Sequence, residues 1–189
     1  MKFPRLLLKT QKMFLVSDTQ ITYHKSPLGT VKIVGDENGI QAVSLLDEDF
    51  STEPVFSEVE RLEMTKSKEI PTCLKDCITQ LEEYFTGTRT EFDLKLNPQG
   101  TVFQQRVWNE LLNIPFNKTR SYLEQSKALG DVKAIRAVAS ANGKNPIAII
   151  IPCHRVIGSD GSLTGYAGGL WRKKWLLDHE NPVKQQSLF

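Results

Sequence analysis

A cysteine, a histidine and an arginine stand side by side in this chain, directly after its most apolar stretch. Residues 147–151 read Ile-Ala-Ile-Ile-Ile, and Pro152, Cys153, His154 and Arg155 follow. The run is short and β-branched, so it predicts a buried strand, which Pro152 would end because proline has no N–H for a ladder. A thiol held there beside an imidazole can be activated as a nucleophile. A free cysteine is also often a plain core residue, so this motif alone leaves both interpretations open.

The charged residues are divided unevenly between the two halves of the chain. Residues 1–100 carry 12 Lys/Arg and 16 Asp/Glu, a net charge of −4, whereas residues 101–189 carry 12 and 6, a net charge of +6. A basic half joined to an acidic half suggests that one of them binds a polyanion. Chance asymmetry on solvated surfaces is the alternative.

Size and composition are those of an ordinary globular protein. The 189 residues, 40% hydrophobic and 24% charged, are enough for one large domain or two small ones. No stretch approaches the ~20 apolar residues that cross a bilayer, and the leucine patch at residues 6–8 is too short for a secretory signal. With three cysteines and no such signal, we expect a cytoplasmic protein with free thiols and no membrane association.

The first half predicts an antiparallel sheet followed by a helix. Alternating stretches separated by Pro/Gly and Asn-Gly turns are typical of hairpins. Three such stretches occur, at residues 21–24, 31–34 and 40–45. Residues 72–86 place apolar side chains at helical spacing, with Gly87 as the stop. Residues 92–96 alternate again and predict one more strand, and Asn-Pro-Gln-Gly at residues 97–100 marks the expected domain boundary.

The second half predicts successive helices with clear start signals. Capping boxes, in which two side chains satisfy free N–H groups at a helix start, are expected at Thr101-x-x-Gln104 and Ser121-x-x-Glu124. The second helix ends at a glycine turn, and Asp131 can cap a third that runs to about residue 142. Helix, glycine turn, helix is the helix-turn-helix arrangement. A further helix follows and must end before Pro182.

The third helix carries an unusual strip of small side chains. Core contacts are expected from Ile135, Val138 and Ala139, and the small-residue strip consists of Ala134, Ala137 and Ala141, with Lys133 and Ser140 nearby. Arg136 interrupts the strip. Small side chains let a helix approach a nucleic-acid backbone closely, and one arginine among them can reach into a groove or stack. An ordinary alanine-rich amphipathic helix is the alternative.

Several motifs, in order and at fixed spacing, give the chain a specific likeness. They are Asn145-Pro146, Ile-Pro-Cys-His-Arg-Val at residues 151–156, Gly-Tyr-Ala-Gly-Gly-Leu at 165–170 and Trp-Leu-Leu-Asp-His-Glu at 175–180. From about Val102 to Glu180 the chain closely resembles the O6-alkylguanine-DNA alkyltransferase family, in its bacterial form. The first half matches only in its general layout.

The resemblance implies an α+β protein of two domains. Residues 1–97 would form an N-terminal α/β domain, in which an antiparallel β-sheet and a helix make an α/β roll of ribonuclease H-like layout. Residues 101–184 would form a mostly helical winged helix-turn-helix domain that binds DNA and carries the alkyltransferase site. Residues 185–189 would be a tail. We expect a monomer that needs no cofactor.

The chemistry that the resemblance implies suits these residues. Thiolate sulfur is the attacking species, and Cys153 would take the alkyl group from guanine O6. His154 would act as base through a water molecule, while Glu180 would orient and stabilise the imidazole, as in a Ser-His-Asp triad. Asn145 resembles a hinge asparagine that ties the recognition helix to the active-site strand. The thioether formed cannot be hydrolysed, so transfer would be irreversible and each molecule would act once.

The same resemblance implies how the substrate is bound. A base inside a duplex must be flipped out before it can react. Arg136 matches an arginine that fills the space left in the stack, and Tyr122 a tyrosine that crowds the phosphate and hydrogen-bonds the base. Lys173 lies where the family has a lysine near the pocket rim. The other residues expected at the substrate are Val156, Ser159, Tyr166, Ala167 and Gly168. Binding in the minor groove, whose code is degenerate, predicts sequence-independent repair of alkylated guanine, and of O4-alkylthymine, in duplex DNA.

Two departures from vertebrate members concern the pocket. Ala167 replaces a serine, so a side-chain hydroxyl is missing there, and Asn142 replaces a larger apolar wall residue, which predicts a roomier pocket. Some of those members also bind zinc in the N-terminal domain. Here Cys73, Cys77 and His24 fall short of the four ligands that zinc usually takes, so no metal is expected.

The chain ends Gln-Gln-Ser-Leu-Phe at residues 185–189. This pentapeptide resembles the motif with which bacterial repair proteins bind the sliding clamp. An extended tail would offer Leu188 and Phe189 as adjacent apolar anchors, with Gln185 fixing the register. A tail that frays or folds back on the domain is the alternative.

Three other functions remain to be weighed. A relative that recognises alkylated bases without repairing them would lack the cysteine, which is present. A helix-turn-helix regulator would explain residues 121–142 but not Cys153, His154 and Glu180. A thiol hydrolase would turn over repeatedly, whereas this site should stop after one event.

Overall fold

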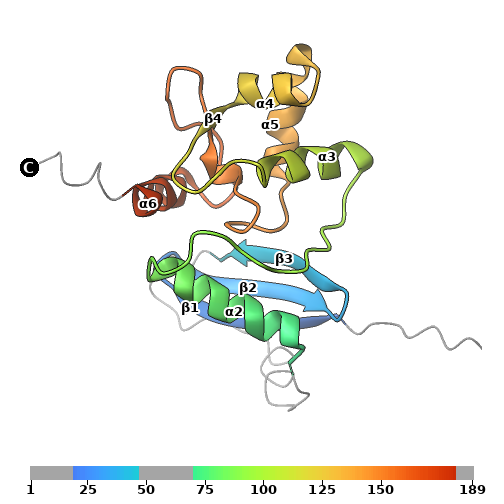
Figure 1. The fold of residues 1–189 in the computed structure, drawn as a ribbon, viewed down its shortest axis with the longest axis vertical. Helices are drawn as coiled ribbons and strands as arrows, with labels where there is room; N and C mark the ends of the chain where they lie inside the picture. The colour runs from blue at the N-terminus through green and yellow to red at the C-terminus, as the bar shows by residue number, and fades with distance from the viewer. Residues whose placement is uncertain (1–18, 47–69, 182–189) are drawn as a thin grey trace, which may run out of the picture.

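The N-terminal half forms a three-stranded antiparallel sheet with one helix against it (Figure 1). The computed structural model describes residues 19–46 and 70–181. Its first strands are β1 (Gln20–Ser26), β2 (Gly29–Asp36) and β3 (Gly39–Leu45), in that order in the sheet. The helix is α2 (Thr72–Phe85). The sheet and helix predicted from the sequence are confirmed, with bounds within a few residues of those expected.

Helical spacing explains how α2 packs on the sheet. Leu74, Cys77, Leu81 and Tyr84 recur at intervals of three and four residues, and all four side chains are fully buried. Such a stripe is what a period of 3.6 residues places on one face. Gly87 follows the helix with a φ of 76°, a left-handed conformation that glycine adopts without strain.

The strand predicted over residues 92–96 is wrong. Within it only Leu96 forms a bridge, a parallel one to Ile40 of β3, with backbone hydrogen bonds of 2.8 and 2.7 Å on the two sides of Ile40. Farther along the same edge of β3, Val43 bridges Ile147 from the C-terminal half. Because two segments share one strand edge, neither pairs with it as a full strand.

The apolar run at residues 147–151 is buried as expected, but it is not the predicted strand. After Ile147 the backbone turns, and two amides donate to carbonyl oxygens two and four residues earlier, at 2.8 and 3.0 Å. Ile149 has a φ of 70°, which costs a residue with a Cβ about 1–2 kcal/mol. The β-branched composition therefore reflects burial. Beyond the bridge at Ile147, the backbone satisfies its polar groups in tight turns.

The C-terminal half is mostly helical. Its elements are α3 (Val102–Leu111), β4 (Arg120–Ser121), α4 (Tyr122–Ala128), α5 (Ile135–Gly143), β5 (Val156–Ile157) and α6 (Leu170–Glu180). Both predicted capping boxes are present, at the starts of α3 and α4. Asp131 caps a short 3-10 helix, Val132–Ala134, which leads into α5.

Helices α4 and α5 form the helix-turn-helix and are tied by a buried pair of amides. Gln125 Nε2 donates to Asn142 Oδ1 (3.2 Å), and Asn142 Nδ2 donates to Gln125 Oε1 (2.7 Å). Trp108 of α3 donates from Nε1 to Ala141 O (2.8 Å). Ala141 is thus a buried core residue and not part of an exposed strip. Asn142 is held in the helix pair, so its side chain is not a free pocket wall.

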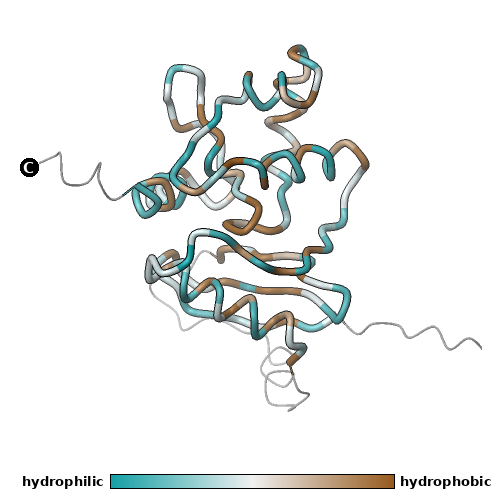
Figure 2. The backbone as a smooth tube through the Cα atoms, viewed as in Figure 1, coloured by the Kyte–Doolittle hydropathy of each residue, from teal (hydrophilic) through white to brown (hydrophobic). Residues whose placement is uncertain are grey.

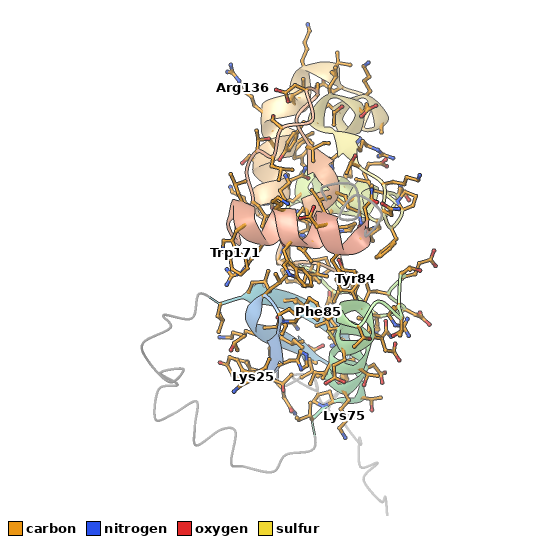
Figure 3. All side chains as sticks on the ribbon, turned by 90° about the vertical axis from the view of Figure 1, so that its left-hand side faces the viewer. Lys25, Lys75, Tyr84, Phe85, Arg136 and Trp171 are labelled. Carbon is orange, nitrogen blue, oxygen red and sulfur yellow. The ribbon has the colours of Figure 1, made fainter. Side chains whose placement is uncertain are left out.

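Of the predicted strip, Ala137 is exposed on the outward face of α5, whereas Ala134 precedes the helix and packs half-buried against the core. Val138 is buried, whereas Ile135 and Ala139 are half-buried. Arg136, Ala137 and Ser140 are exposed on this face, and Asp131, Val132 and Lys133 are exposed in the preceding turn. Arg136 projects from the end of the molecule that lies opposite the sheet (Figure 3). On α5 itself the exposed surface is small, polar and basic.

The two halves meet where α6 lies over α2 (Figures 1 and 3). Phe85 contacts Trp175 edge-on at 5.9 Å between ring centroids, and Tyr84 contacts His179 at 5.1 Å. Hydrophobic stretches of the chain lie in the strands and in the segment facing them (Figure 2). Residues 97–101 between the halves carry no helix or strand. The domain bounds themselves remain a prediction.

None of the helices within residues 19–46 and 70–181 is long and apolar enough to cross a membrane. The leucine patch at residues 6–8 and the tail at residues 185–189 lie outside the described residues.

Candidate active site

Cys153 opens a short 3-10 helix, Cys153–Arg155, directly after the buried turn. The side chain of Asn145 contacts both the turn and Cys153. Its Nδ2 donates to Ile151 O (2.8 Å) and to Cys153 Sγ (3.3 Å), and its Oδ1 accepts from Ile147 N (3.0 Å). One amide side chain therefore fixes the turn and orients the thiol.

The surroundings of Cys153 keep its thiol protonated at neutral pH. Burial raises the pKa of this thiol, while the hydrogen bond from Asn145 and the charge of Lys173 lower it by less. Since the thiolate is the nucleophile, an attack by Cys153 requires a base that takes the thiol proton.

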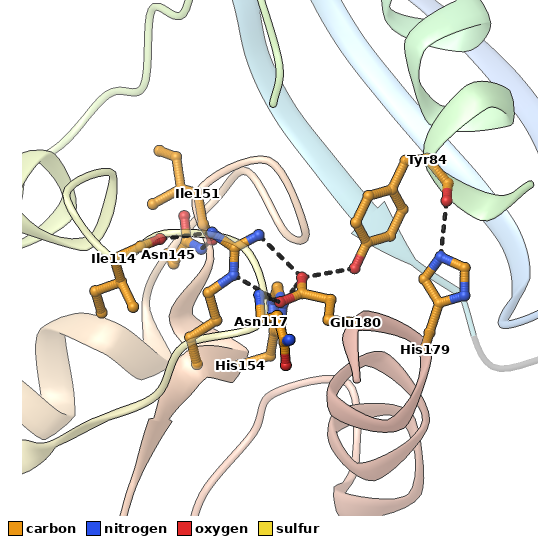
Figure 4. A network of polar contacts seen from close by, with 9 residues as sticks. Tyr84, Ile114, Asn117, Asn145, Ile151, His154, His179 and Glu180 are labelled. Carbon is orange, nitrogen blue, oxygen red and sulfur yellow. Dashed lines mark hydrogen bonds and ion pairs between the residues drawn. The ribbon is translucent and has the colours of Figure 1, made fainter. Parts of the chain in front are cut away.

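A carboxylate with many donors stands behind His154 (Figure 4). His154 is fully buried, and its Nε2 lies 2.8 Å from Oε1 of Glu180, the last residue of α6. Arg155 donates from Nε to Oε2 and from Nη2 to Oε1, both at 2.9 Å. The backbone N–H of Asn117 donates to Oε2 (3.2 Å) and the Tyr84 hydroxyl to Oε1 (2.9 Å). All these groups act as donors, so Glu180 is the acceptor of the network.

The ionisation of Glu180 decides which nitrogen of His154 is the base. Burial alone raises the pKa of the Glu180 carboxyl, but the hydrogen bonds from His154 and Arg155 and the charge of the Arg155 guanidinium lower it to about 2. A carboxylate only accepts hydrogen bonds, so Nε2 of His154 carries the proton. Burial lowers the pKa of His154, which keeps the ring neutral. Its buried Nδ1 has no hydrogen-bond partner among the described residues, and it is the nitrogen with a free lone pair.

Lys173 is fully buried, whereas the sequence led us to expect a lysine near the pocket rim. Its Nζ donates to Val156 O (2.6 Å) and Thr164 O (2.8 Å) and lies 5.8 Å from the centroid of the Tyr122 ring. Burial lowers the pKa of Lys173 to about 8, and Cys153 raises it slightly in return. The ammonium thus ties β5 to the loop before α6 while facing the thiol.

Two tyrosines lie beside the thiol. The Tyr122 hydroxyl donates to Thr164 O (3.1 Å), and the Tyr166 hydroxyl is buried without a hydrogen-bond partner among the described residues. Burial raises the pKa of both phenols, and the nearby Cys153 raises them further. The structure therefore brings Tyr122, Tyr166, Lys173 and Asn145 together around Cys153.

The remaining expected residues are placed differently. Val156 is buried in β5 and Gly168 is half-buried, whereas Ser159 and Ala167 are exposed. Arg136 is exposed on α5, at the end of the molecule that lies opposite the sheet (Figure 3).

Three residues that donate hydrogen bonds to Glu180 were not predicted from the sequence to take part in the site. Arg155 follows His154 directly, and this adjacency was the available signal. Asn117 contributes only its backbone N–H, and Tyr84 comes from the other half of the chain, 96 residues before Glu180. Neither has a local sequence signal, because a backbone donor can be any residue and helix α2 needs an apolar side chain at position 84 in any case.

A cavity of about 270 Å³ is lined by β5, α6 and the loop before β4, and Ile157, Leu177 and Glu180 are among its residues. Cys153 does not line it, so it is not the pocket expected to receive a base. No group of three or more His, Cys, Asp or Glu within residues 19–46 and 70–181 could hold a metal ion.

Two family models match consecutive parts of the chain. Residues 20–98 match the ribonuclease-like domain of 6-O-methylguanine DNA methyltransferase, and residues 102–182 match its DNA-binding domain. Fold and site thus define a protein with a ribonuclease-like N-terminal part, a DNA-binding C-terminal part and a buried His-Glu pair that directly follows a half-buried cysteine.

Individual relatives agree. A methylated-DNA–protein-cysteine methyltransferase of Methanosarcina acetivorans is 46% identical over 156 residues, which is 82% of this chain and 94% of that protein. The crystal structure of Mycobacterium tuberculosis O6-methylguanine methyltransferase aligns with a TM-score of 0.72 and 41% identity, over 87% of this chain and 93% of that one. Mycobacterium tuberculosis OGT in complex with DNA aligns with a TM-score of 0.71 and 41% identity, over 85% and 91%. This chain belongs to the methylated-DNA–protein-cysteine methyltransferase family, and the resemblance found in the sequence is confirmed.

The ionised state of Glu180 predicts a specific sensitivity to acid. Folding lowers the pKa of this carboxyl from 4.5 to about 2, so its stabilisation is complete above about pH 4.5 and is lost as the pH falls towards 2. Since one pKa unit corresponds to about 1.4 kcal/mol, we expect a loss on the order of 3 kcal/mol in the free energy of unfolding. Urea unfolding of the wild-type protein and of Glu180→Gln measures this loss. The difference between their free energies of unfolding should be largest at about pH 6 and should decrease as the pH falls.

The matched control is Glu91→Gln, which removes an exposed carboxylate and should show no such narrowing. A gap between wild type and Glu180→Gln that stays constant with pH would mean that Glu180 is not held ionised.

Proposed function

We propose that this protein repairs O6-alkylguanine in duplex DNA by transferring the alkyl group to Sγ of its own Cys153. The observation that carries the proposal is the neutral His154, whose Nε2–H faces the ionised Glu180 (2.8 Å) while Nδ1 is left as a base. A thiol held by Asn145 stands next to it in the chain. Membership of a methyltransferase family and the likeness to a relative in complex with DNA support it.

The reaction follows from these groups. The proton of Cys153 passes through a water molecule to Nδ1 of His154, and Glu180 stabilises the imidazolium formed. The thiolate attacks the alkyl carbon, so that an S–C bond forms as the bond from carbon to guanine O6 breaks. Guanine keeps the bonding electron pair and takes up one proton, which the imidazolium of His154 returns through water, so that His154 is neutral again. The thioether is not hydrolysed, so each molecule acts once. The same displacement applies to O4-alkylthymine.

The pocket for the base is formed by the segments around the thiol. Tyr122 and Tyr166 flank Cys153, and the backbone of Val156 and of residues 166–168 offers polar groups to a guanine edge. Exposed Ser159 and Ala167 would meet the nucleotide at the entrance. Lys173 holds the two walls together through Val156 O and Thr164 O, and its charge favours the thiolate form of Cys153.

DNA would bind at the outward face of α5. Lys133, Arg136, Ala137 and Ser140 are exposed there, and the C-terminal half carries the positive charge of the chain. Small residues allow a close approach to the minor groove, and Arg136 would enter the stack as the target base flips out. A helix-turn-helix regulator would account for α4 and α5, but not for the ionised carboxylate behind His154. We place the reaction in a monomer in the cytoplasm.

The first prediction concerns the nucleophile. Cys153→Ser should lower single-turnover transfer by more than about a thousandfold and leave binding to alkylated duplex intact, because the thiolate is needed for attack and not for docking. Intact mass after incubation with O6-methylguanine DNA measures it: the wild type should gain one methylene, on one cysteine, once. The control, Cys73→Ser with Cys77→Ala, should react at the wild-type rate. Transfer by Cys153→Ser, or a second methylene on the wild type, would contradict the assignment.

The second prediction concerns base flipping. Arg136→Ala should slow repair of duplex DNA by at least about tenfold and leave the reaction with free O6-benzylguanine unchanged, because the free base needs no extrusion. Single-turnover rates on the two substrates give the ratio. Lys133→Ala is the control: it removes an exposed charge beside the same helix and should weaken DNA binding, more so at low salt, without changing the ratio at saturating protein. Equal losses on both substrates for Arg136→Ala would remove Arg136 from the flipping step.

The third prediction concerns the tail at residues 185–189, whose sequence supports binding to a bacterial sliding clamp. A tether of this kind raises the local concentration of a repair protein on replicated DNA without touching the lesion. A peptide of residues 181–189 should bind the clamp of the source organism, and the same peptide with Leu188→Ala and Phe189→Ala should not. Calorimetry or fluorescence anisotropy measures this. Equal binding by the two peptides, or none at high micromolar concentration, would reject the partner.

A further inference from the structure

Tyr84 reaches the reaction centre from the N-terminal half of the molecule. It lies on α2, and its hydroxyl donates to Glu180 Oε1 at 2.9 Å (Figure 4). The same oxygen lies 2.8 Å from His154 Nε2. A side chain of the ribonuclease-like part therefore contacts the same carboxylate oxygen as His154 in the DNA-binding part.

The direction of this hydrogen bond is fixed by charge. Burial, and after it the negative charge of Glu180, raise the pKa of the Tyr84 phenol far above its ordinary value. The phenol therefore stays protonated and donates to the carboxylate, which can only accept. A hydrogen bond from a neutral donor to an ion is stronger than one between neutral groups.

The ring of Tyr84 is held in place without its hydroxyl. It is fully buried and contacts three phenylalanine rings, Phe92 at 5.4 Å, Phe85 at 5.5 Å and Phe116 at 6.3 Å between centroids. Its backbone oxygen also accepts from His179 Nε2 (2.7 Å). Packing fixes the ring, so the hydroxyl is held at one position relative to Glu180.

We propose that Tyr84 is a positioning residue for alkyl transfer: its hydroxyl fixes Oε1 of Glu180 against His154 and withdraws part of the carboxylate charge from the imidazole. The N-terminal half thereby completes the reaction centre. This inference rests on the proposed function, in which His154 is the base.

The consequence is a shift in the pH at which His154 is neutral. The groups that face this ring are Glu180 and Lys173 on α6, Arg155 beside it in the chain and, through Glu180, Tyr84 on α2. Glu180 raises the pKa of His154, whereas burial, Arg155 and Lys173 lower it. Loss of the Tyr84 donor leaves more charge on Oε1, which favours the imidazolium. A base that must be neutral then becomes active only at higher pH.

The test is the pH dependence of transfer by Tyr84→Phe, which keeps the ring and removes the hydroxyl. Free O6-benzylguanine is the substrate, since it needs no DNA binding. The midpoint of the acid limb should rise by about 0.5–1 pH unit, so that the rate below it falls by about three- to tenfold and recovers at alkaline pH. An NMR titration of the His154 ring measures the pH at which the ring becomes neutral. Its midpoint should also rise in Tyr84→Phe.

The control is Trp175→Leu on α6. Trp175 contacts Phe85 of α2 in the same interface and is not one of the rings packed against Tyr84. It should lower the melting temperature and leave the pH profile and the His154 titration at their wild-type midpoints. If Tyr84→Phe also changes only the melting temperature, Tyr84 packs the interface and the proposal is wrong.

A second substitution covers the case in which Tyr84→Phe does not fold. Site-specific replacement of Tyr84 by 3-fluorotyrosine keeps the hydroxyl and makes it a stronger donor, so both midpoints should move to lower pH, opposite to Tyr84→Phe. An unchanged or raised midpoint would overturn the proposal. The NMR titration does not depend on alkyl transfer, so it separates the two hypotheses. If the wild-type protein does not alkylate Cys153, the proposed function is refuted. The titration midpoint of His154 then still tests whether Tyr84 acts on the His154–Glu180 pair.

Discussion

A carboxylate buried as deeply as that of Glu180 is strongly destabilising unless its oxygens are paired. Here Arg155 supplies two donors, and Asn117, Tyr84 and His154 supply one each. Removing any of them leaves part of a charge unpaired at the centre of the molecule. The positions of α2, α6, the loop before β4 and the segment after the buried turn are therefore all tied to one side chain.

The same constraint explains why the site lies where the two halves of the chain meet. Tyr84 comes from the N-terminal half, and Val43 of β3 exchanges backbone hydrogen bonds of 2.9 Å with the start of the buried turn. Arg172 of α6 donates to Leu28 O (2.9 Å) and Leu46 O (2.7 Å) in the N-terminal half. The contacts that orient the thiol segment are thus shared between halves, and loosening their interface would disturb the base as well as the fold.

Local signals predicted most of the fold. The turns between β1, β2 and β3, the apolar spacing of α2 and the capping boxes of α3 and α4 are each encoded within a few residues. The two predicted strands that failed, at residues 92–96 and 147–151, depended on pairing with a distant edge. Both segments reach the edge of β3 at single residues, Ile40 and Val43. Composition shows that such a run is buried, but only the partner decides whether it is a strand.

The sequence by itself determined which groups are available for chemistry. Cys153, His154 and Arg155 are contiguous, and the motifs around Asn145, Tyr166 and Glu180 identify the family. The tertiary structure decided the state of these groups. It buries Lys173 where a rim residue was expected, holds Asn142 in an amide pair with Gln125, and brings Tyr84 to Glu180 across 96 positions of the chain. Protonation and orientation depend on burial and on the neighbouring charges and donors. Those neighbours come from segments far apart in sequence, so they are defined only once the chain has folded.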